Sequence, residues 1–166
     1  MRVYEITLAK ENMKFSSAHF TVFEHGAERL HGHNYRVVLT LKSARLRSGM
    51  LVDFAFLKQE ARRLCAELDE SLLLPAACSA LTIESHGAEI EVRCGTKRYV
   101  LPAEDCRLLP IPNLTCECLA EYFCDTLLER LRPRLRDAGV VALVATVEES
   151  PGQSGRCEET LLNAES

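Results

Sequence analysis

The sequence predicts an α+β fold, in which an antiparallel β-sheet carries two helices packed on one face. Three features of the chain indicate this class. Residues 3–45 contain two strand-like stretches rich in β-branched and apolar residues. Residues 54–68 and 116–132 place apolar side chains at helical spacing, and residues 140–147 form a near-continuous apolar strand. The predicted order is strand, strand, helix, inserted strands, helix and strand, with room for one further strand.

The first two strands are expected to pair with each other. Residues 3–15 alternate loosely and predict one interrupted strand that leads to His19. Residues 21–30 show no apolar period and predict a loop, and about 33–45 predict the second strand. A connection this short favours antiparallel pairing of the two strands.

Both predicted helices begin at a capping residue. Asp53 can accept a backbone N–H of the first turn, and apolar residues then recur at three- and four-residue steps as far as Leu68. Thr115 is placed to cap the second helix, which is expected to end or kink at Pro133. The polar residues 151–166 are expected to be loose at the terminus.

The segment at about 76–111 predicts an inserted β meander of three strands. Alternating residues flank a glycine turn at His86-Gly87, and a second turn signal at 95–97 precedes another short strand. The prolines at 110 and 112 then predict an extended linker into the second helix.

Composition excludes several classes of partner. The 166 residues predict one domain, 1–166, in which 47% of residues are hydrophobic and 27% are charged. A net charge of −4 leaves no basic surface for nucleic acid. No apolar run approaches the ~20 residues of a membrane helix. Charged residues near the N-terminus argue against an export signal, so we expect a cytoplasmic protein whose eight cysteines are reduced.

Three histidines near the start of the chain form a candidate metal site. His31 and His33 are two residues apart in the second predicted strand, so their side chains share one face of the sheet. His19 ends the preceding strand, and the loop between can bring it alongside. Three neutral imidazoles with an open fourth position are typical of catalytic zinc, which we expect as the cofactor. The alternative is that they are ordinary strand histidines.

Short motifs distributed along the chain carry a family resemblance. In order, they are Phe15-Ser16-Ser17-Ala18-His19, His31-Gly32-His33-Asn34-Tyr35, Gly49-Met50-Leu51-Val52-Asp53-Phe54 with Leu57-Lys58, Leu68-Asp69, Thr115-Cys116-Glu117 and Glu149-Ser150. The chain is thereby similar to the 6-pyruvoyltetrahydropterin synthase and 6-carboxytetrahydropterin synthase family. The resemblance spans most of the chain, apart from the inserted segment, which is usually short in that family.

The resemblance implies the tunnelling fold, in which protomers join their sheets into a barrel with active sites at subunit boundaries. A homotrimer or homohexamer is therefore expected. The resemblance also implies that Glu149 binds the pterin ring and that Thr115 helps to position it. A carboxylate suits this role, because its two oxygens can accept the adjacent N–H and NH₂ groups of a 2-amino-4-oxo pyrimidine ring. Glu148 is the alternative if the strand register shifts by one residue.

One departure from the family concerns its acid–base cysteine, which usually lies a few residues before His-Gly-His. Residues 25–30 contain no cysteine, and Glu28 lies three residues before His31 instead. This is similar to a subgroup in which glutamate replaces the cysteine and the substrate side chain is cleaved. A carboxylate can act as this base provided that burial raises its pKa toward neutrality.

A second departure concerns the family's proton relay, in which Leu-Asp is followed by histidine. Here the corresponding residues are Leu68-Asp69-Glu70. Three explanations stay open: Asp69 and Glu70 work differently, another histidine (His25 or His86) substitutes, or activity is reduced or changed.

These features together predict a zinc-dependent pterin lyase that cleaves the side chain of 7,8-dihydroneopterin, or of its triphosphate, to give 6-hydroxymethyl-7,8-dihydropterin. In this interpretation Glu28 moves the proton, and Asp69 and Glu70 are further catalytic candidates. The alternatives are the family's pyruvoyl- or carboxy-tetrahydropterin synthase chemistry, and a pterin- or metal-binding protein without turnover.

Overall fold

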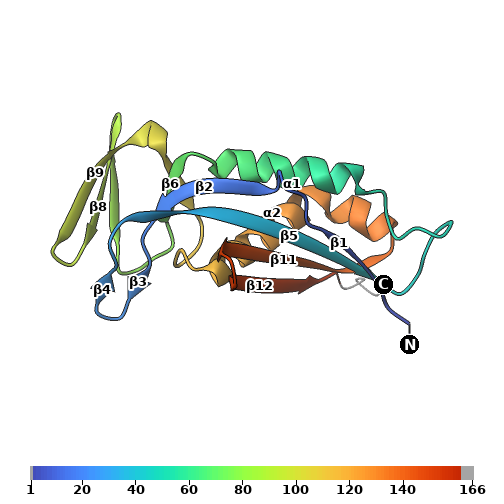
Figure 1. The fold of residues 1–166 in the computed structure, drawn as a ribbon. Helices are drawn as coiled ribbons and strands as arrows, with labels where there is room; N and C mark the ends of the chain where they lie inside the picture. The colour runs from blue at the N-terminus through green and yellow to red at the C-terminus, as the bar shows by residue number, and fades with distance from the viewer. Residues whose placement is uncertain (1, 162–166) are drawn as a thin grey trace.

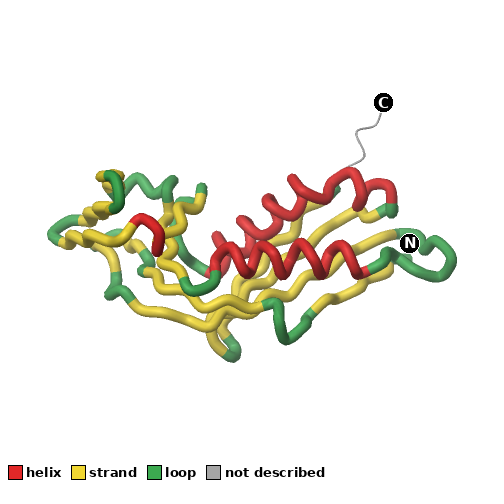
Figure 2. Tube along the Cα trace, turned by 90° about the horizontal axis from the view of Figure 1, so that it is seen from above, coloured by secondary structure: helices red, strands yellow, loops and turns green. Residues whose placement is uncertain are grey.

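Two helices lie across one face of a β-sheet in the computed structural model, which describes residues 2–161 (Figures 1 and 2). The helices are α1 (Phe54–Leu68) and α2 (Cys116–Asp137). The sheet has seven strands within the described residues. They are β1 (Tyr4–Leu8), β2 (Lys14–His19), β5 (His31–Ser43), β6 (Ser71–Pro75), β10 (Cys106–Leu109), β11 (Val140–Ser150) and β12 (Gln153–Thr160).

The sheet is antiparallel at its centre and parallel at one edge. Its order is β10-β6-β2-β5-β11-β12, and β1 also pairs with β5. The pairs that β5 makes with β1, β2 and β11 are antiparallel, whereas β6 runs parallel to both β2 and β10. The predicted α+β class, with two helices on one face of the sheet, is confirmed. The sequence left room for one further strand, whereas three strands beyond those predicted (β6, β10 and β12) widen the sheet within the described residues.

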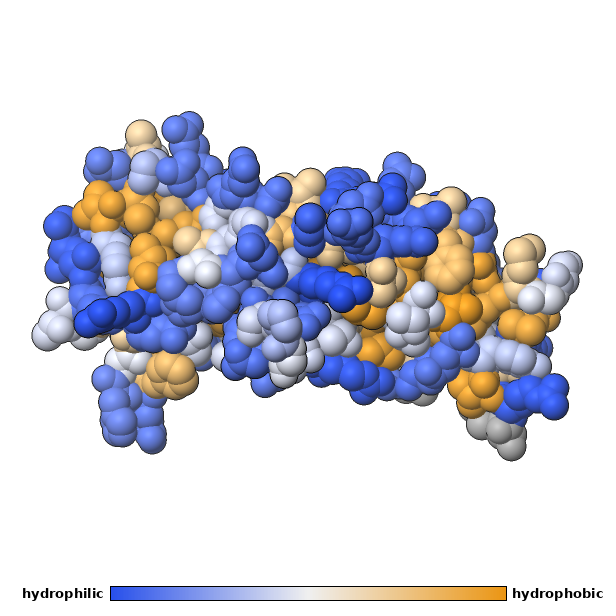
Figure 3. Space-filling model, viewed as in Figure 1, coloured by the Kyte–Doolittle hydropathy of each residue, from blue (hydrophilic) through white to orange (hydrophobic). Residues whose placement is uncertain are grey.

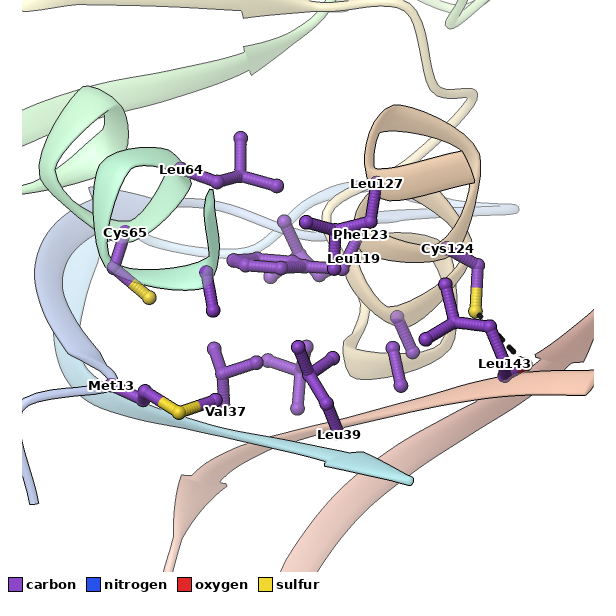
Figure 4. Packing of buried hydrophobic residues seen from close by; sticks show 14 of the residues in the cluster. Met13, Val37, Leu39, Leu64, Cys65, Leu119, Phe123, Cys124, Leu127 and Leu143 are labelled. Atoms are coloured by element: carbon purple, nitrogen blue, oxygen red, sulfur yellow. Dashed lines mark hydrogen bonds between the residues drawn. The ribbon is translucent and has the colours of Figure 1, made fainter. Parts of the chain in front are cut away.

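The main core fills the space between the helices and the sheet, as Figure 4 shows. Aromatic rings form its centre, because Phe15 stacks on Tyr35 at 4.8 Å and on Phe123 at 6.0 Å between ring centroids. Aliphatic side chains of α1 and α2 close over the strands around them, among them Leu64, Leu119 and Leu127 above Met13, Val37 and Leu39. Burial of this one sheet face fixes which side of each strand points toward the helices.

Both predicted helix caps are present. The Asp53 side chain accepts the Ala55 N–H at 2.9 Å, and the Thr115 hydroxyl accepts the Cys118 N–H at 3.3 Å. Of the two outcomes expected at Pro133, an end or a kink of the helix, the end is wrong, because α2 continues to Asp137. Pro133 lies on the exposed side of α2. Leu131 and Leu135, before and after it, are buried and keep the helix packed on the sheet.

The predicted meander is confirmed as a separate three-stranded sheet at one end of the molecule, on the left in Figure 1. It consists of β7 (Thr82–His86), β8 (Glu89–Cys94) and β9 (Lys97–Pro102), followed by a short 3₁₀ turn. Residues 106–109 then return to the main sheet as β10, so the inserted unit is shorter than predicted. Figure 3 shows hydrophobic side chains gathered on the meander, away from those beside the helices.

Two segments expected to be irregular are strands. The loop at 21–30 contains a small hairpin, β3 (Val22–Phe23) with β4 (Gly26–Ala27). The tail is not loose throughout, since β12 pairs with β11 from Gln153 to Thr160. Most β12 side chains are exposed, so backbone pairing holds this edge strand and no hydrophobic pattern reveals it. Residues 162–166 of the predicted tail lie outside the described residues. Neither α-helix between residues 2 and 161 is both long and apolar enough to cross a membrane.

We predict that Gly155→Ala disturbs the start of α2. A Cβ at Gly155 would lie 2.3 Å from the Cys116 carbonyl carbon and from the Glu117 nitrogen, both backbone atoms. Because backbone cannot move aside cheaply, the free energy of unfolding should fall by about 1–3 kcal/mol, measured by urea denaturation. Ser154→Ala, at an exposed position of the same strand, is the control and should change it by less than about 0.5 kcal/mol. Equal stability of the two variants would contradict this contact.

Candidate metal and pterin site

The register between β2 and β5 brings the three predicted histidines together. His19 lies directly opposite His31, and Ser17 lies opposite His33. Since alternate residues of a strand point to the same side, all three imidazoles lie on the helix side of the sheet. One ligand nitrogen from each can be chosen so that all three lie within 4.8 Å of one another. This spacing suits a single metal ion held by three nitrogens.

Backbone carbonyl groups orient two of the rings. His19 Nδ1 lies 3.1 Å from the Leu114 oxygen, and His31 Nδ1 lies 2.8 Å from the Arg29 oxygen. A carbonyl oxygen can only accept, so each Nδ1 donates its hydrogen and each Nε2 keeps a free lone pair. His19 Nε2 is buried, and nothing in residues 2–161 offers it a hydrogen-bond partner. A buried, unpaired imidazole nitrogen aimed among two other histidines fits a metal ligand.

The electrostatic environment keeps His19 neutral. Burial lowers the pKa of this imidazole, and the nearby His31 and His33 lower it further, because a charged His19 would be desolvated and would face other cations. Zinc is held by neutral imidazoles, so the donor set matches the zinc expected from the sequence.

Glu28 lies next to these histidines, between the small hairpin and β5. Its carboxylate accepts the Thr21 N–H at 2.6 Å, and its own N–H donates to the Thr21 oxygen at 3.0 Å. Burial acts to raise the pKa of Glu28, but the Thr21 hydrogen bonds and the nearby His31 and His19 outweigh it and leave the pKa below its ordinary value. The condition that burial raises this pKa toward neutrality is therefore not met in the chain by itself, and Glu28 is ionised at neutral pH.

Glu149 lies on the same side of β11 as the buried Val147, the side on which the histidines lie. The pairing of β11 with β12 shifts register between Glu148 and Ser150, which sets Glu149 apart from the regular ladder. Its Oε2 lies 4.0 Å from His33 Nε2, while Glu148 accepts the Gly152 N–H at 3.3 Å in the adjoining turn. Of the two predicted candidates for ring binding, Glu149 is the one beside the metal site.

The first residues of α2 lie against Glu149. Burial raises the pKa of the Cys116 thiol to about 11, and the Glu149 carboxylate contributes to this both through its charge and through a hydrogen bond. Cys116 is therefore a protonated thiol that contacts Glu149, and it is a poor substitute for an acid–base cysteine. Thr115, which precedes it, caps α2 with its hydroxyl.

Asp69 and Glu70 do not belong to the cluster that the three histidines form in the part of the chain that the structure describes. Asp69 accepts the Ser16 N–H at 2.7 Å, just after α1 ends. Glu70 has a positive φ of 52° and lines a hollow of about 540 Å³ whose other lining residues include Ser16, Ala18, Asn34 and His33. Ser16, Ala18 and Asn34 alternate with the histidines along β2 and β5, so their side chains point to the other face of the sheet, although His33 also borders the hollow. Any catalytic role for Asp69 or Glu70 stays a prediction.

The model of the 6-pyruvoyl tetrahydropterin synthase family matches residues 7–160. The chain belongs to this family. Among relatives, a Methanocaldococcus jannaschii protein provisionally named 6-carboxy-5,6,7,8-tetrahydropterin synthase is 33% identical over 146 residues, covering 87% of this chain and 88% of that protein. A similarly named Pyrococcus horikoshii protein is 28% identical, covering 70% of each chain.

Solved structures of family members agree with the fold in detail. The 6-pyruvoyl tetrahydropterin synthase of Plasmodium vivax is 30% identical with a TM-score of 0.91, covering 96% of this chain and 99% of that chain. The Plasmodium falciparum protein of that name is 28% identical with a TM-score of 0.90, covering 95% and 98%. Coverage this complete leaves too few residues unmatched to contain the meander, which is therefore not peculiar to this family member.

Some residues that build the site could not be recognised in the sequence. Leu114 and Arg29 contribute only backbone carbonyl groups, which every residue possesses, so no side-chain pattern identifies them. Thr21 also contributes backbone groups to Glu28, in addition to its side chain. The histidines were found from their spacing and side-chain chemistry, and Glu149 from the family resemblance.

We predict that this family member binds about one zinc per chain and that His31→Ala or His33→Ala loses it, because three protein ligands are usual for catalytic zinc. Metal content is measured by elemental mass spectrometry after dialysis. His86→Ala is the control, since His86 is exposed on the meander and contacts Glu84. Full zinc content in both His31→Ala and His33→Ala would show that the metal is bound elsewhere.

Proposed function

We propose that this chain is a zinc-dependent pterin lyase. Its substrate would be 7,8-dihydroneopterin or its triphosphate, and its product 6-hydroxymethyl-7,8-dihydropterin. The observation that carries the proposal is the position of Glu28, an ionised carboxylate anchored beside His19 and His31 in a stretch without cysteine. The similar P. vivax enzyme supports it, because that protein has been solved with a catalytic glutamate replaced by alanine or by cysteine.

Glu149 would bind the pterin ring. Its side chain is 24% exposed next to His33, so it can accept hydrogen bonds from a ligand without leaving its place. Two carboxylate oxygens match the paired N–H donors of the ring, as the family resemblance implies. Thr115 would help to position the ring from the start of α2, which lies against Glu149 through Cys116.

Glu28 would move the proton. A zinc ion held by His19, His31 and His33 would supply Lewis-acid chemistry that makes the side-chain hydroxyl groups of the substrate more acidic. Glu28 takes the proton from the hydroxyl on the second side-chain carbon, and the bond between the first and second carbons breaks. The electron pair passes to the ring at C6=N5, and a proton returned to the first carbon completes the hydroxymethyl product. The remaining carbons leave as an aldehyde.

The assembly would be a cytoplasmic homotrimer or homohexamer without nucleic-acid or membrane partners. This part of the proposal rests on the family resemblance, in which active sites lie at subunit boundaries. It also gives Asp69 and Glu70 a place, since Glu70, next to Asp69 in the chain, lines a hollow that a neighbouring subunit could cover. They would then assist proton transfer across the boundary.

A second candidate function is favoured by the names of the relatives. The M. jannaschii protein is provisionally named a 6-carboxy-tetrahydropterin synthase, and the Plasmodium structures carry the name 6-pyruvoyl tetrahydropterin synthase. Identification of products by mass spectrometry separates these reactions from side-chain cleavage. A pterin- or metal-binding protein without turnover would give no product at all.

We predict that Glu28→Ala lowers the rate of 6-hydroxymethyl-7,8-dihydropterin formation by about 10²–10⁴-fold, the usual contribution of a general acid–base group. Zinc content and pterin affinity should stay close to those of the unchanged protein, because the histidines and Glu149 hold the ligands. Glu24→Ala is the control, an exposed glutamate of the same loop. Only pyruvoyl or carboxy products from the unchanged protein would refute side-chain cleavage to 6-hydroxymethyl-7,8-dihydropterin, and no product would favour the binding protein.

Glu149→Gln should weaken pterin binding at least tenfold while zinc stays bound. The amide keeps the shape of the side chain but turns one acceptor into a donor that faces the N–H groups of the ring, at a cost of roughly 1–3 kcal/mol. Affinity is measured by calorimetry with 7,8-dihydroneopterin. Glu148→Gln is the neighbouring control, and a larger loss in that variant would assign ring binding to Glu148 instead.

A further inference from the structure

Lys97 connects the meander to the segment that carries Glu28. It is the first residue of β9, after the glycine turn that follows β8. Its Nζ donates to the backbone oxygens of Ala27 and Glu28, the latter at 2.6 Å. These two carbonyl groups lie about seventy residues away in the chain, at the end of the small hairpin and directly after it. The side chain of Lys97 is half-buried, so this is an interior contact between two parts of the fold.

Hydrophobic packing brings the meander to this place. Tyr99 of β9 stacks on Phe20, with ring centroids 5.4 Å apart and planes 15° from parallel. Phe20 is fully buried and directly follows His19. A second core cluster joins Ile90 and Val92 of β8 to Phe20, and Val22 and Ala27 pack against it. The meander is therefore fixed against the hairpin that precedes Glu28.

Glu28 is thus held from two sides. The Thr21 N–H binds its carboxylate, and Lys97 binds its backbone oxygen together with that of the preceding residue. With the peptide fixed on one side and the carboxylate on the other, the direction of the side chain is determined. The Arg29 oxygen that orients His31 is on the next residue, so the same backbone segment also serves the metal site.

We propose that Lys97 is a positioning residue for Glu28 and that the meander sets the geometry of proton transfer through it. The inference rests on the proposed role of Glu28 as the base. Lysine suits this position, because its flexible stem crosses the packed interface and its ammonium group offers three donors to several acceptors at once. Without it, two half-buried carbonyl groups lose their donor, and the segment is free to move. A displacement of about 1 Å at a catalytic group can cost about 10²-fold in rate.

The test compares Lys97→Met, which keeps the stem but removes the donor, with Lys97→Arg, which restores a donor. Arg93→Met is the matched control on the same meander, since Arg93 contacts Glu91, which Arg98 continues to hold. Lys97→Met should lower kcat by about 10–100-fold with KM and zinc content unchanged, and Lys97→Arg should recover most of it. Amide hydrogen exchange of residues 20–31, followed by mass spectrometry, should be faster in Lys97→Met and unchanged in Arg93→Met.

A double variant separates positioning from general stability. If Lys97 acts through Glu28, adding Lys97→Met to Glu28→Ala should not lower the residual rate further. The proposal would be overturned if Lys97→Met lowered the rate of the Glu28→Ala variant as much as it lowers that of the unchanged protein. It would also be overturned if the hydrogen exchange of residues 20–31 were unchanged in Lys97→Met. The exchange measurement needs no turnover, so a protein without lyase activity would refute the proposed function while the role of Lys97 is still decided.

Discussion

The antiparallel register between β2 and β5 is the constraint on which the site depends. Because side chains alternate along a strand, a slip of one residue would turn His31 and His33 to the other face of the sheet. The stack of Phe15 on Tyr35 in the core holds the register. Gly32 permits it, since a Cβ there would lie 3.3 Å from the Ser17 oxygen. A hydrophobic contact thus determines the position of a polar site.

The metal and ring positions are linked through the start of α2. Leu114 orients His19 with its carbonyl group, and two residues later Cys116 contacts Glu149. The approach of β12 at Gly155 fixes this part of the helix against the sheet. One short segment therefore sets both the direction of a metal ligand and the distance from the metal site to the ring-binding carboxylate.

Side-chain chemistry and periodicity were enough to predict the helices, the meander and the histidine cluster, because each leaves a pattern in the sequence, whereas Glu149 was singled out by the family resemblance. The features that were missed leave no such pattern in the sequence. β12 is exposed and held by backbone pairing, α2 continues through Pro133 because its leucines remain buried, and Leu114 and Arg29 act through carbonyl groups. The expected rise in the pKa of Glu28 failed because Thr21 hydrogen bonds, invisible in sequence, outweigh burial.

Zinc K-edge X-ray absorption of the loaded protein tests the central claim most directly. Three imidazole nitrogens at about 2.0–2.1 Å, with one further light ligand and the outer-shell scattering typical of histidine, are the expected result. The chain has eight cysteines, which offer a different kind of zinc site. Sulfur scattering at about 2.3 Å would show that thiolates hold the metal, and would contradict the assignment of His19, His31 and His33.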